Sequence, residues 1–353
     1  MGYLRLLLIP FSLAYGLVVW IRNRCYDRGW FSSTSVSVPT IVVGNLAVGG
    51  TGKSPMVEYL IRLLAGTYRL ATLSRGYGRE TRGYLEVSTT HTAAQCGDEP
   101  LQFKRKFPQV TVAVCEDRVQ GVKRLMETGH DVILLDDAFQ HRALKPGLAI
   151  LLFDFRTLQR PRLLLPAGNF RDMLAERRRA DVMIVTKTPV SAESGEKDRI
   201  RRRLEAGQRA PVLFAGIGYG PLVPVSTAIA DAVELDWDTS VLLVSGIANP
   251  VPLLEFLSER VGSVQQVAYP DHHPYTVSDV RRIKAAFDRL PPGRRLVLTT
   301  EKDAQRLWTP RLQPELASLP LYMIPIEVRF DGQDERVFRR IITEYCAGAS
   351  RSG

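Results

Sequence analysis

Residues 41–55 read IVVGNLAVGGTGKSP, and this stretch decides the fold. It begins with three β-branched residues, which are typical of a buried strand. Glycines follow, and then a lysine and a serine before an amphipathic stretch, which predicts a strand, a loop and a helix in that order. Backbone N–H groups in such a loop point at phosphate oxygens, and the helix N-terminus adds about half a positive charge. The stretch therefore predicts a phosphate-binding loop.

Each polar group of this loop has an expected role. Lys53 reaches the β- and γ-phosphates of a nucleotide, and the hydroxyl of Ser54 binds Mg²⁺. One position departs from the usual spacing, because Ala47 stands where the motif normally has its first glycine. A glycine-rich turn with a chance Lys-Ser pair is the alternative, but the strand–loop–helix context favours a site for ATP and Mg²⁺. The expected nucleotide-binding residues are Gly49, Gly50, Thr51, Gly52, Lys53 and Ser54.

Apolar runs and amphipathic stretches alternate around this loop. Short apolar runs at 70–74, 110–114, 131–135, 148–153 and 182–186 predict further strands, with helical patterns or loops between them. Such alternation is typical of a mostly parallel sheet that is covered by helices on both faces.

A second series of strands and helices follows a densely charged segment at 189–209. It starts with a strand at 212–216 and ends with a strand at 321–328 and a helix at 334–346. We therefore expect an α/β fold of two α/β/α sandwich domains, the first P-loop NTPase-like, preceded by an N-terminal membrane-associated helix. The expected boundaries are 1–31 for that helix and its basic flank, 32–210 for the P-loop domain and 211–353 for the second domain with its C-terminal helix.

The N-terminal run is strongly apolar. Residues 4–21 carry one charge, Arg5, and eighteen helical residues cover about 27 Å, close to the shortest length that spans a bilayer. Three arginines between residues 22 and 28 predict that the following chain stays cytoplasmic, and they replace the small residues of a signal-peptide cleavage site. A buried core helix is the alternative. Pro10 leaves open whether the run spans the membrane or lies in it.

The overall composition narrows the class of partner. The net charge is +10, which favours an anionic partner such as a nucleotide, a phospholipid surface or a phosphorylated substrate. A nucleic-acid interface would interleave aromatic and basic residues on one face, and no such pattern is present, so we expect no nucleic-acid partner. None of the four cysteines is spaced as a CxxC pair, which indicates neither a zinc site nor a redox motif.

Two aspartates, Asp136 and Asp137, close the apolar run at 131–135. A carboxylate at the end of a strand beside a phosphate loop is where a further Mg²⁺ contact is expected. Either aspartate fits this role, and a turn-forming aspartate at a strand end is the structural alternative.

Two further polar motifs are candidates for acid–base chemistry. Asp98, in the motif GDEP, either caps a helix or accepts the proton of an acceptor hydroxyl. His272 and His273 follow Asp271 after a strand of the second domain. Adjacent histidines rarely face one metal ion, so pairing of one histidine with a carboxylate is the more plausible role.

Taken together, these stretches resemble the lipid A 4′-kinases (tetraacyldisaccharide 4′-kinases) of Gram-negative bacteria. The motifs that carry the resemblance run in one order from about residue 1 to residue 330. They are the N-terminal apolar helix, GNLAVGGTGKSP, LSRGYGR at 73–79, GDEP, DDAFQHR at 136–142, LLPAG at 164–168, VTKTP at 185–189 and DHHPYT. That family also tends to lack the first glycine of the loop, where this chain has Ala47. Ala138 replaces a glycine that is more usual in the family.

The resemblance implies an activity, a place and a mechanism. It implies transfer of the γ-phosphate of ATP to the 4′-hydroxyl of a tetraacylated glucosamine disaccharide 1-phosphate, a lipid A precursor. The reaction would take place at the cytoplasmic face of the inner membrane, with inner-membrane lipids as a further partner. We also expect the chain to be a monomer. By motif match the resemblance implies that Asp98 is the base, assisted by His272, with His273 as the second candidate. Because the two residues fall in different domains, their meeting would require hinge closure.

Several arginines extend these expectations. They are candidates for binding the 1-phosphate of the acceptor or the membrane surface: Arg75, Arg79, Arg118, Arg142, Arg171 and the run Arg177–Arg179. Two alternatives to the kinase remain open. One is a P-loop GTPase or metal-delivery NTPase, suggested by Lys187 in a strand-borne motif that resembles a guanine-reading sequence without its aspartate. The other is a membrane-tethered nucleic-acid-binding protein, suggested only by the basic charge.

Overall fold

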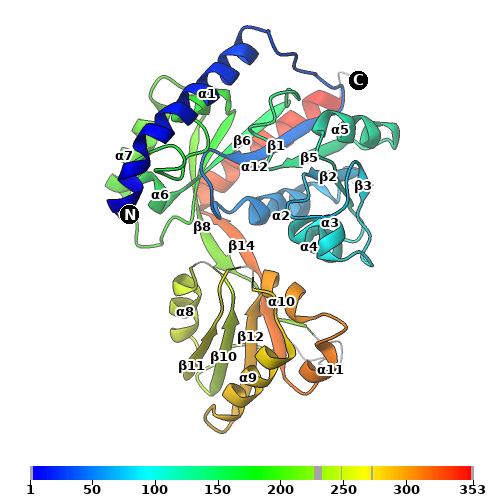
Figure 1. Ribbon diagram of the computed structural model, residues 1–353, viewed down its shortest axis with the longest axis vertical. Coiled ribbons are helices and arrows are strands. Elements are labelled where there is room, and N and C mark those ends of the chain that lie inside the picture. Colours follow the sequence, from blue (N-terminus) through cyan, green and yellow to red (C-terminus); the bar gives the residue numbers. More distant parts are fainter. Residues whose placement is uncertain (1–2, 226–232, 248, 272, 351–353) are drawn as a thin grey trace. The chain divides into compact units, whose positions relative to one another are not determined.

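The computed structural model describes residues 3–225, 233–247, 249–271 and 273–350. The chain divides into two compact units, each with its own sheet (Figure 1). Unit 1 comprises Met1–Gly218 and Val328–Gly353, and unit 2 comprises Tyr219–Glu327. This division differs from the expected boundaries, because the C-terminal segment returns to unit 1 instead of closing the second domain.

The larger sheet has nine strands and lies mostly in unit 1. Its strands are β1 (Thr40–Asn45), β2 (Leu70–Ser74), β3 (Leu85–Glu86), β4 (Thr111–Val114), β5 (Val132–Asp136), β6 (Leu148–Asp154), β7 (Val182–Thr186), β8 (Val212–Tyr219) and β14 (Ile326–Phe330). They lie in the order β14-β8-β7-β6-β1-β5-β2-β4-β3. The pairs from β8 through to β4 are parallel, and β3 pairs antiparallel with β4. The expected mostly parallel sheet is confirmed.

Two apolar cores cover the two faces of this sheet. Ile41 and Val43 of β1 pack into one core with α2 (Lys53–Leu64) and α12 (Gly332–Ser350). Val42, one residue out of phase, packs into the other core with α5 (Arg118–Glu127) and α7 (Ser194–Glu205). Successive side chains of a strand point to opposite faces, so these buried strands are apolar on both sides.

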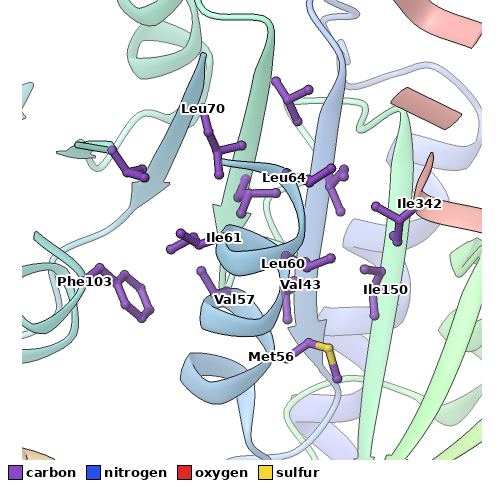
Figure 2. Close-up of a cluster of buried hydrophobic side chains, with 14 of the residues drawn as sticks. Val43, Met56, Val57, Leu60, Ile61, Leu64, Leu70, Phe103, Ile150 and Ile342 are labelled. Carbon is purple, nitrogen blue, oxygen red and sulfur yellow. The ribbon is translucent and has the colours of Figure 1, made fainter. Parts of the chain in front are cut away.

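Figure 2 shows the first of these cores around α2. Met56, Val57, Leu60 and Ile61 repeat at helical spacing and are fully buried. This packing fixes the start of α2 and therefore the position of the loop that precedes it. The remaining helices of unit 1 are η1 (Tyr3–Leu8), α1 (Ile9–Asp27), α3 (Ala93–Cys96), α4 (Asp98–Lys106), α6 (Phe155–Leu158) and η2 (Leu174–Arg179).

Helix α1 packs on the rest of unit 1 through its small and polar residues. Its buried residues are Ser12, Gly16, Asn23 and Cys25. The Ser12 hydroxyl donates to the carbonyl of Leu164 (3.0 Å) and accepts from the amide of Ala167 (2.9 Å). Most of the large apolar side chains of α1 are exposed instead. Among the described helices, none combines the length and the apolar character needed to cross a bilayer.

Unit 2 has a five-stranded sheet of its own. Its strands are β9 (Val223–Pro224), β10 (Thr239–Ser245), β11 (Ser263–Ala268), β12 (Arg294–Thr300) and β13 (Leu321–Ile324), in the order β11-β10-β12-β13-β9. Its helices are α8 (Val251–Ser258), α9 (Val277–Asp288), α10 (Glu301–Leu307) and α11 (Gln313–Leu316). Leu242 of β10 packs with α9, and Leu243 packs with α8 on the other face. The four strands β10 to β13 are parallel.

Two sequence-based expectations about these sheets are wrong. The strand expected at 212–216 as the start of the second domain is β8, which pairs with β7 in the larger sheet. The single strand expected at 321–328 is two strands, β13 and β14, in different sheets. Pro325 separates them, and because proline cannot donate a ladder hydrogen bond, the chain changes sheets there.

Candidate active site

The candidate site lies at the carboxyl ends of β1, β5, β6 and β7. These strands are neighbours in a parallel sheet, so their carboxyl ends meet at one edge. In open α/β sheets ligands bind in the crevice at this edge. The glycine-rich loop follows β1, the aspartate pair follows β5, Asp154 ends β6, and Lys187 follows β7.

The glycine-rich loop has the backbone that its sequence predicts. Gly49 and Gly52 adopt φ angles of +110° and +81°, which side-chain-bearing residues rarely adopt, so glycine is required at both positions. Helix α2 begins at Lys53, and Ser54 is its second residue. The side-chain amide of Asn45 donates to the Thr51 hydroxyl (2.7 Å), which ties the end of β1 to the far side of the loop.

Asp137 is the charge centre of the site. Its Oδ1 lies 3.9 Å from Nζ of Lys53, and its Oδ2 accepts from the Arg171 guanidinium at 3.2 Å. Burial alone would raise the pKa of Asp137, but the Arg171 hydrogen bond and the charge of Lys53 lower it below its ordinary value. Asp137 has a φ angle of +49°, a conformation in which non-glycine residues are uncommon. This carboxylate is therefore held ionised between two cations.

Asp136, unlike Asp137, has no cation paired with its carboxylate among the described residues. It is buried, and its Oδ1 has no hydrogen-bond partner. Burial and then the charge of Asp137 raise the pKa of Asp136 to about 7. A buried carboxylate oxygen without a partner is costly unless a cation compensates it, and Mg²⁺ prefers oxygen ligands. The residues present therefore fit a Mg²⁺ ion that is held by Asp136 and Ser54.

Asp98 is the first residue of α4. The turn before it is tight, because a Cβ on Gly97 (φ +95°) would lie 3.2 Å from the carbonyl oxygen of Tyr77. The next residue, Glu99, lies within electrostatic reach of the acid pair, since its charge contributes to the raised pKa of Asp136. The GDEP motif is thus near the strand-end acids, with Asp98 at a helix N-terminus.

The two histidine candidates have different outcomes. His272 lies outside the described residues. The Nε2 atom of His273 lies 3.1 Å from Oδ2 of Asp279, and its ring stacks on Tyr269 with a centroid separation of 4.6 Å. Asp279 also accepts from the backbone N–H of Thr276 (2.8 Å), at the start of α9. His273 is therefore occupied in a contact within unit 2.

Arg171 and Lys187 are site residues whose place the local sequence did not predict. Arg171 was expected at the acceptor phosphate or the membrane, whereas its guanidinium contacts Asp137 and the side chain of Asn45. Nζ of Lys187 contacts the carbonyl of Gly50 and Oδ2 of Asp154 (3.1 Å). One signal for Lys187 was available in the sequence, because this residue directly follows the strand expected at 182–186. Such a local position does not predict which residue across the site a side chain contacts.

The other candidate arginines have different surroundings. Arg118 is buried, and its charge acts on both aspartates of the site. Four others pair elsewhere: Arg79 with Glu116, Arg142 and Arg178 with Asp27, and Arg179 with Glu176. Arg75 lines a pocket together with Tyr77 and Glu116. Arg177 donates to backbone carbonyls of Leu204 and Ala206.

A family model described as tetraacyldisaccharide-1-P 4′-kinase matches residues 4–346. The chain belongs to this family. It is 41% identical over 352 residues to the tetraacyldisaccharide 4′-kinase of Phocaeicola vulgatus, a match that covers 98% of this chain and 96% of that protein. It is 40% identical over 358 residues to the tetraacyldisaccharide 4′-kinase of Bacteroides thetaiotaomicron, covering 98% and 94%.

A solved structure agrees with the family assignment. The structure of LpxK from Aquifex aeolicus in complex with ATP has a TM-score of 0.75 to this chain at 30% identity, covering 97% of this chain and 99% of that one. The resemblance found in the sequence is thus confirmed, and the chain is a kinase. The match decides against the GTPase and nucleic-acid-binding alternatives.

Proposed function

We propose that this chain transfers the γ-phosphate of ATP to the 4′-hydroxyl of a tetraacylated glucosamine disaccharide 1-phosphate. The observation that carries the proposal is the convergence of Lys53, a glycine-rich loop and the aspartates Asp136 and Asp137 at one sheet edge, in a chain that the kinase family model matches over residues 4–346. Phosphoryl transfer needs positioning and charge neutralisation more than covalent chemistry, and these residues supply both.

The phosphate end of the reaction belongs to the loop and the acid pair. Lys53 binds the β- and γ-phosphates, and the carboxylate of Asp137, itself paired with Arg171, holds the Lys53 ammonium in place before the nucleotide arrives. Asp136, with its partnerless oxygen, is our choice between the two aspartates for the metal, together with Ser54. When bound, Mg²⁺ neutralises charge on the phosphates. Asp137 then serves to orient Lys53.

The acceptor end of the reaction belongs to Asp98 and His272. Asp98 accepts the proton of the sugar hydroxyl as phosphorus–oxygen bond formation proceeds. Two observations support this choice: the GDEP motif lies near the acid pair, and Asp98 stands at a helix start. His273 is already engaged by Asp279, which favours His272 as the assisting residue.

The N-terminal helix suits a lipid substrate. Exposed apolar side chains on α1 include Phe11 (65% exposed), Leu13 (71%) and Val18 (65%). Contiguous exposed apolar surface marks interaction sites, and exposed arginines beside it attract anionic lipid. Arg24 and Arg28 lie over the rings of Trp20 and Trp30 at the end of this face. We infer that α1 lies in the cytoplasmic face of the inner membrane.

Vesicle binding tests the role of α1. We expect the native chain to sediment with vesicles that contain anionic phospholipid, and Leu13→Glu and Val18→Glu to reduce the bound fraction at least fivefold, because each places a charge in the apolar layer. Val190→Glu is the matched control, since Val190 is also an exposed apolar residue but lies far along the chain in a loop of unit 1. Equal binding by all variants would rule out the α1 face.

Label transfer tests the kinase chemistry. With γ-labelled ATP and a tetraacylated glucosamine disaccharide 1-phosphate, we expect Lys53→Ala and Asp98→Ala each to lose at least about 10²-fold in kcat while remaining folded. Lys284→Ala is the matched lysine control, because its ion pair with Glu315 lies in unit 2. Full activity of Asp98→Ala would reject our choice of base. We also propose that the chain is a monomer, which light scattering on the same preparations tests.

A further inference from the structure

The carboxyl end of β7 contacts the glycine-rich loop at two successive carbonyl groups. The Thr186 hydroxyl donates to the carbonyl of Thr51 at 2.8 Å, and the Lys187 ammonium donates to the carbonyl of Gly50. The two contacts join residues more than 130 positions apart in the sequence. They fix the loop from the side of its carbonyl groups.

Peptide geometry connects these carbonyl groups to the phosphate-binding amides. In a planar trans peptide the C=O and the following N–H point in opposite directions. A donor that holds the carbonyl of Thr51 therefore aims the N–H of Gly52 away from β7. The amide next to Lys53 is one of those that cradle phosphate in such loops. The N–H of Thr51 already donates to the carbonyl of Gly49 (3.0 Å), so the Gly52 amide is the one that this contact presents.

The Thr186 side chain is built to hold this orientation. It is buried, and its Oγ1 lies 2.8 Å from the carbonyl oxygen of Thr51 and 3.1 Å from that of Phe153. The hydroxyl has one hydrogen to donate, and the Thr51 carbonyl is the nearer acceptor. The Cβ of Thr186 lies 3.7 Å from the place where a side chain on Gly52 would begin, which is ordinary van der Waals contact. Thr186 therefore lies directly beside Gly52 as well as bonding to the Thr51 carbonyl.

Lys187 supports the same loop from the next position. It has a φ angle of +54°, which is uncommon for a residue other than glycine and indicates that surrounding contacts hold it. Those contacts are the Gly50 carbonyl and, at 3.1 Å, Oδ2 of Asp154 at the end of β6. The ends of two strands therefore hold the tip of the loop.

We propose that Thr186, assisted by Lys187, is a positioning residue that orients the Gly52 amide toward the phosphates of ATP. The inference rests on the proposed role of the glycine-rich loop as the triphosphate site. Thr186 does not touch the nucleotide itself. It acts through the loop backbone, so its loss weakens nucleotide binding more than it slows turnover of the bound complex.

Substitutions of Thr186 test this role. Thr186→Val keeps the shape of the side chain and removes the donor, and Thr186→Ser keeps the donor. We expect Thr186→Val to raise the KM for ATP and its dissociation constant about tenfold, with kcat and the KM for the lipid changed less than threefold. Thr186→Ser should stay within threefold of the native chain. An unchanged dissociation constant for Thr186→Val would overturn the proposal.

Thr188→Val is the matched control for burial of a methyl group. Its hydroxyl is also buried and two residues away, but it donates to the carbonyl of Val185 (2.9 Å) within the same turn. If Thr188→Val weakens ATP binding as much as Thr186→Val does, the effect is general destabilisation and the proposal fails. Lys53→Ala distinguishes a failure of the proposed triphosphate site from a failure of the proposed Thr186 role. If Lys53→Ala leaves ATP binding intact, the assignment of the glycine-rich loop as the triphosphate site is wrong. If it abolishes binding while Thr186→Val binds normally, only the present inference falls.

Discussion

Asp136 of unit 1 and Asp303 of unit 2 occupy comparable places in their sheets. Asp136 ends β5, and Asp303 lies three residues beyond the end of β12, and both are buried. Their hydrogen bonding is opposite. Oδ2 of Asp303 accepts from the N–H of Gly246 (2.9 Å) and the hydroxyl of Thr300 (2.8 Å), and its Oδ1 accepts from the hydroxyl of Tyr275 (3.1 Å). Oδ1 of Asp136 has no partner.

The contrast extends to the surroundings of the two carboxylates. Among the residues that the structure describes, the buried side-chain polar atoms without a partner all belong to unit 1, and several lie on Asp136, Arg118, Arg171 and Gln140 around the candidate site. A satisfied buried carboxylate stabilises a fold, whereas an unsatisfied one stores a cost that a ligand can remove. Burial of an acid at a strand end is therefore common to both units, and the missing partner distinguishes Asp136 from Asp303.

The largest expected effect tests the unsatisfied member of this pair. Asp136→Asn keeps the volume of the side chain and removes its charge. We expect kcat/KM for phosphoryl transfer to fall by about 10²–10³, because a ligand of the metal is lost. The free energy of unfolding without nucleotide should stay equal or rise, since a buried carboxylate with a partnerless oxygen is replaced by a neutral amide.

Two measurements on the same preparation check this expectation. Label transfer with Mg·ATP gives the activity, and denaturant unfolding of the nucleotide-free chain gives the stability. A variant that loses stability in proportion to activity would show that Asp136 is a structural residue like Asp303. A missing hydrogen-bond partner would then not mark a buried acid as functional.

The sequence predicted the parts of the site that lie within one motif. Lys53 and Ser54 begin α2, and Asp136 ends β5, as the local pattern of strand, loop and helix requires. The strands at 70–74 and 182–186 were predicted to the residue. These features depend on the period of apolar residues and on glycine conformations, both of which are local.

The rest depended on contacts between distant segments. Arg171 meets Asp137 across 34 residues of sequence, and Lys187 meets Gly50 across 137. No local pattern encodes such a pairing. The amphipathic pattern of α12 likewise gives a buried face but not the sheet it covers, and Phe338 and Ile342 prove to pack on the larger sheet. Propensity cannot distinguish the two sheets because their apolar strands are alike.

A smaller effect is expected from the satisfied member of the pair. Asp303→Asn keeps the volume but cannot accept from all three donors, so at least one of the Gly246 N–H, Thr300 hydroxyl and Tyr275 hydroxyl loses its acceptor. We expect the free energy of opening of unit 2 to fall by about 2 kcal/mol. Hydrogen exchange of the β10 and β12 amides measures this opening directly, because those strands flank the carboxylate.

Nucleotide binding separates this variant from Asp136→Asn. The glycine-rich loop belongs to unit 1, so the dissociation constant of Asp303→Asn for ATP should remain within twofold of the native value at a temperature where unit 2 is folded. Glu315→Gln is the control, since its carboxylate pairs with Lys284 at the surface of unit 2 and exposed pairs contribute little. If Asp303→Asn instead keeps its amide protection and loses ATP binding, then complete hydrogen bonding does not mark a buried acid as structural. The carboxylate of unit 2 would then have to be counted with the functional residues.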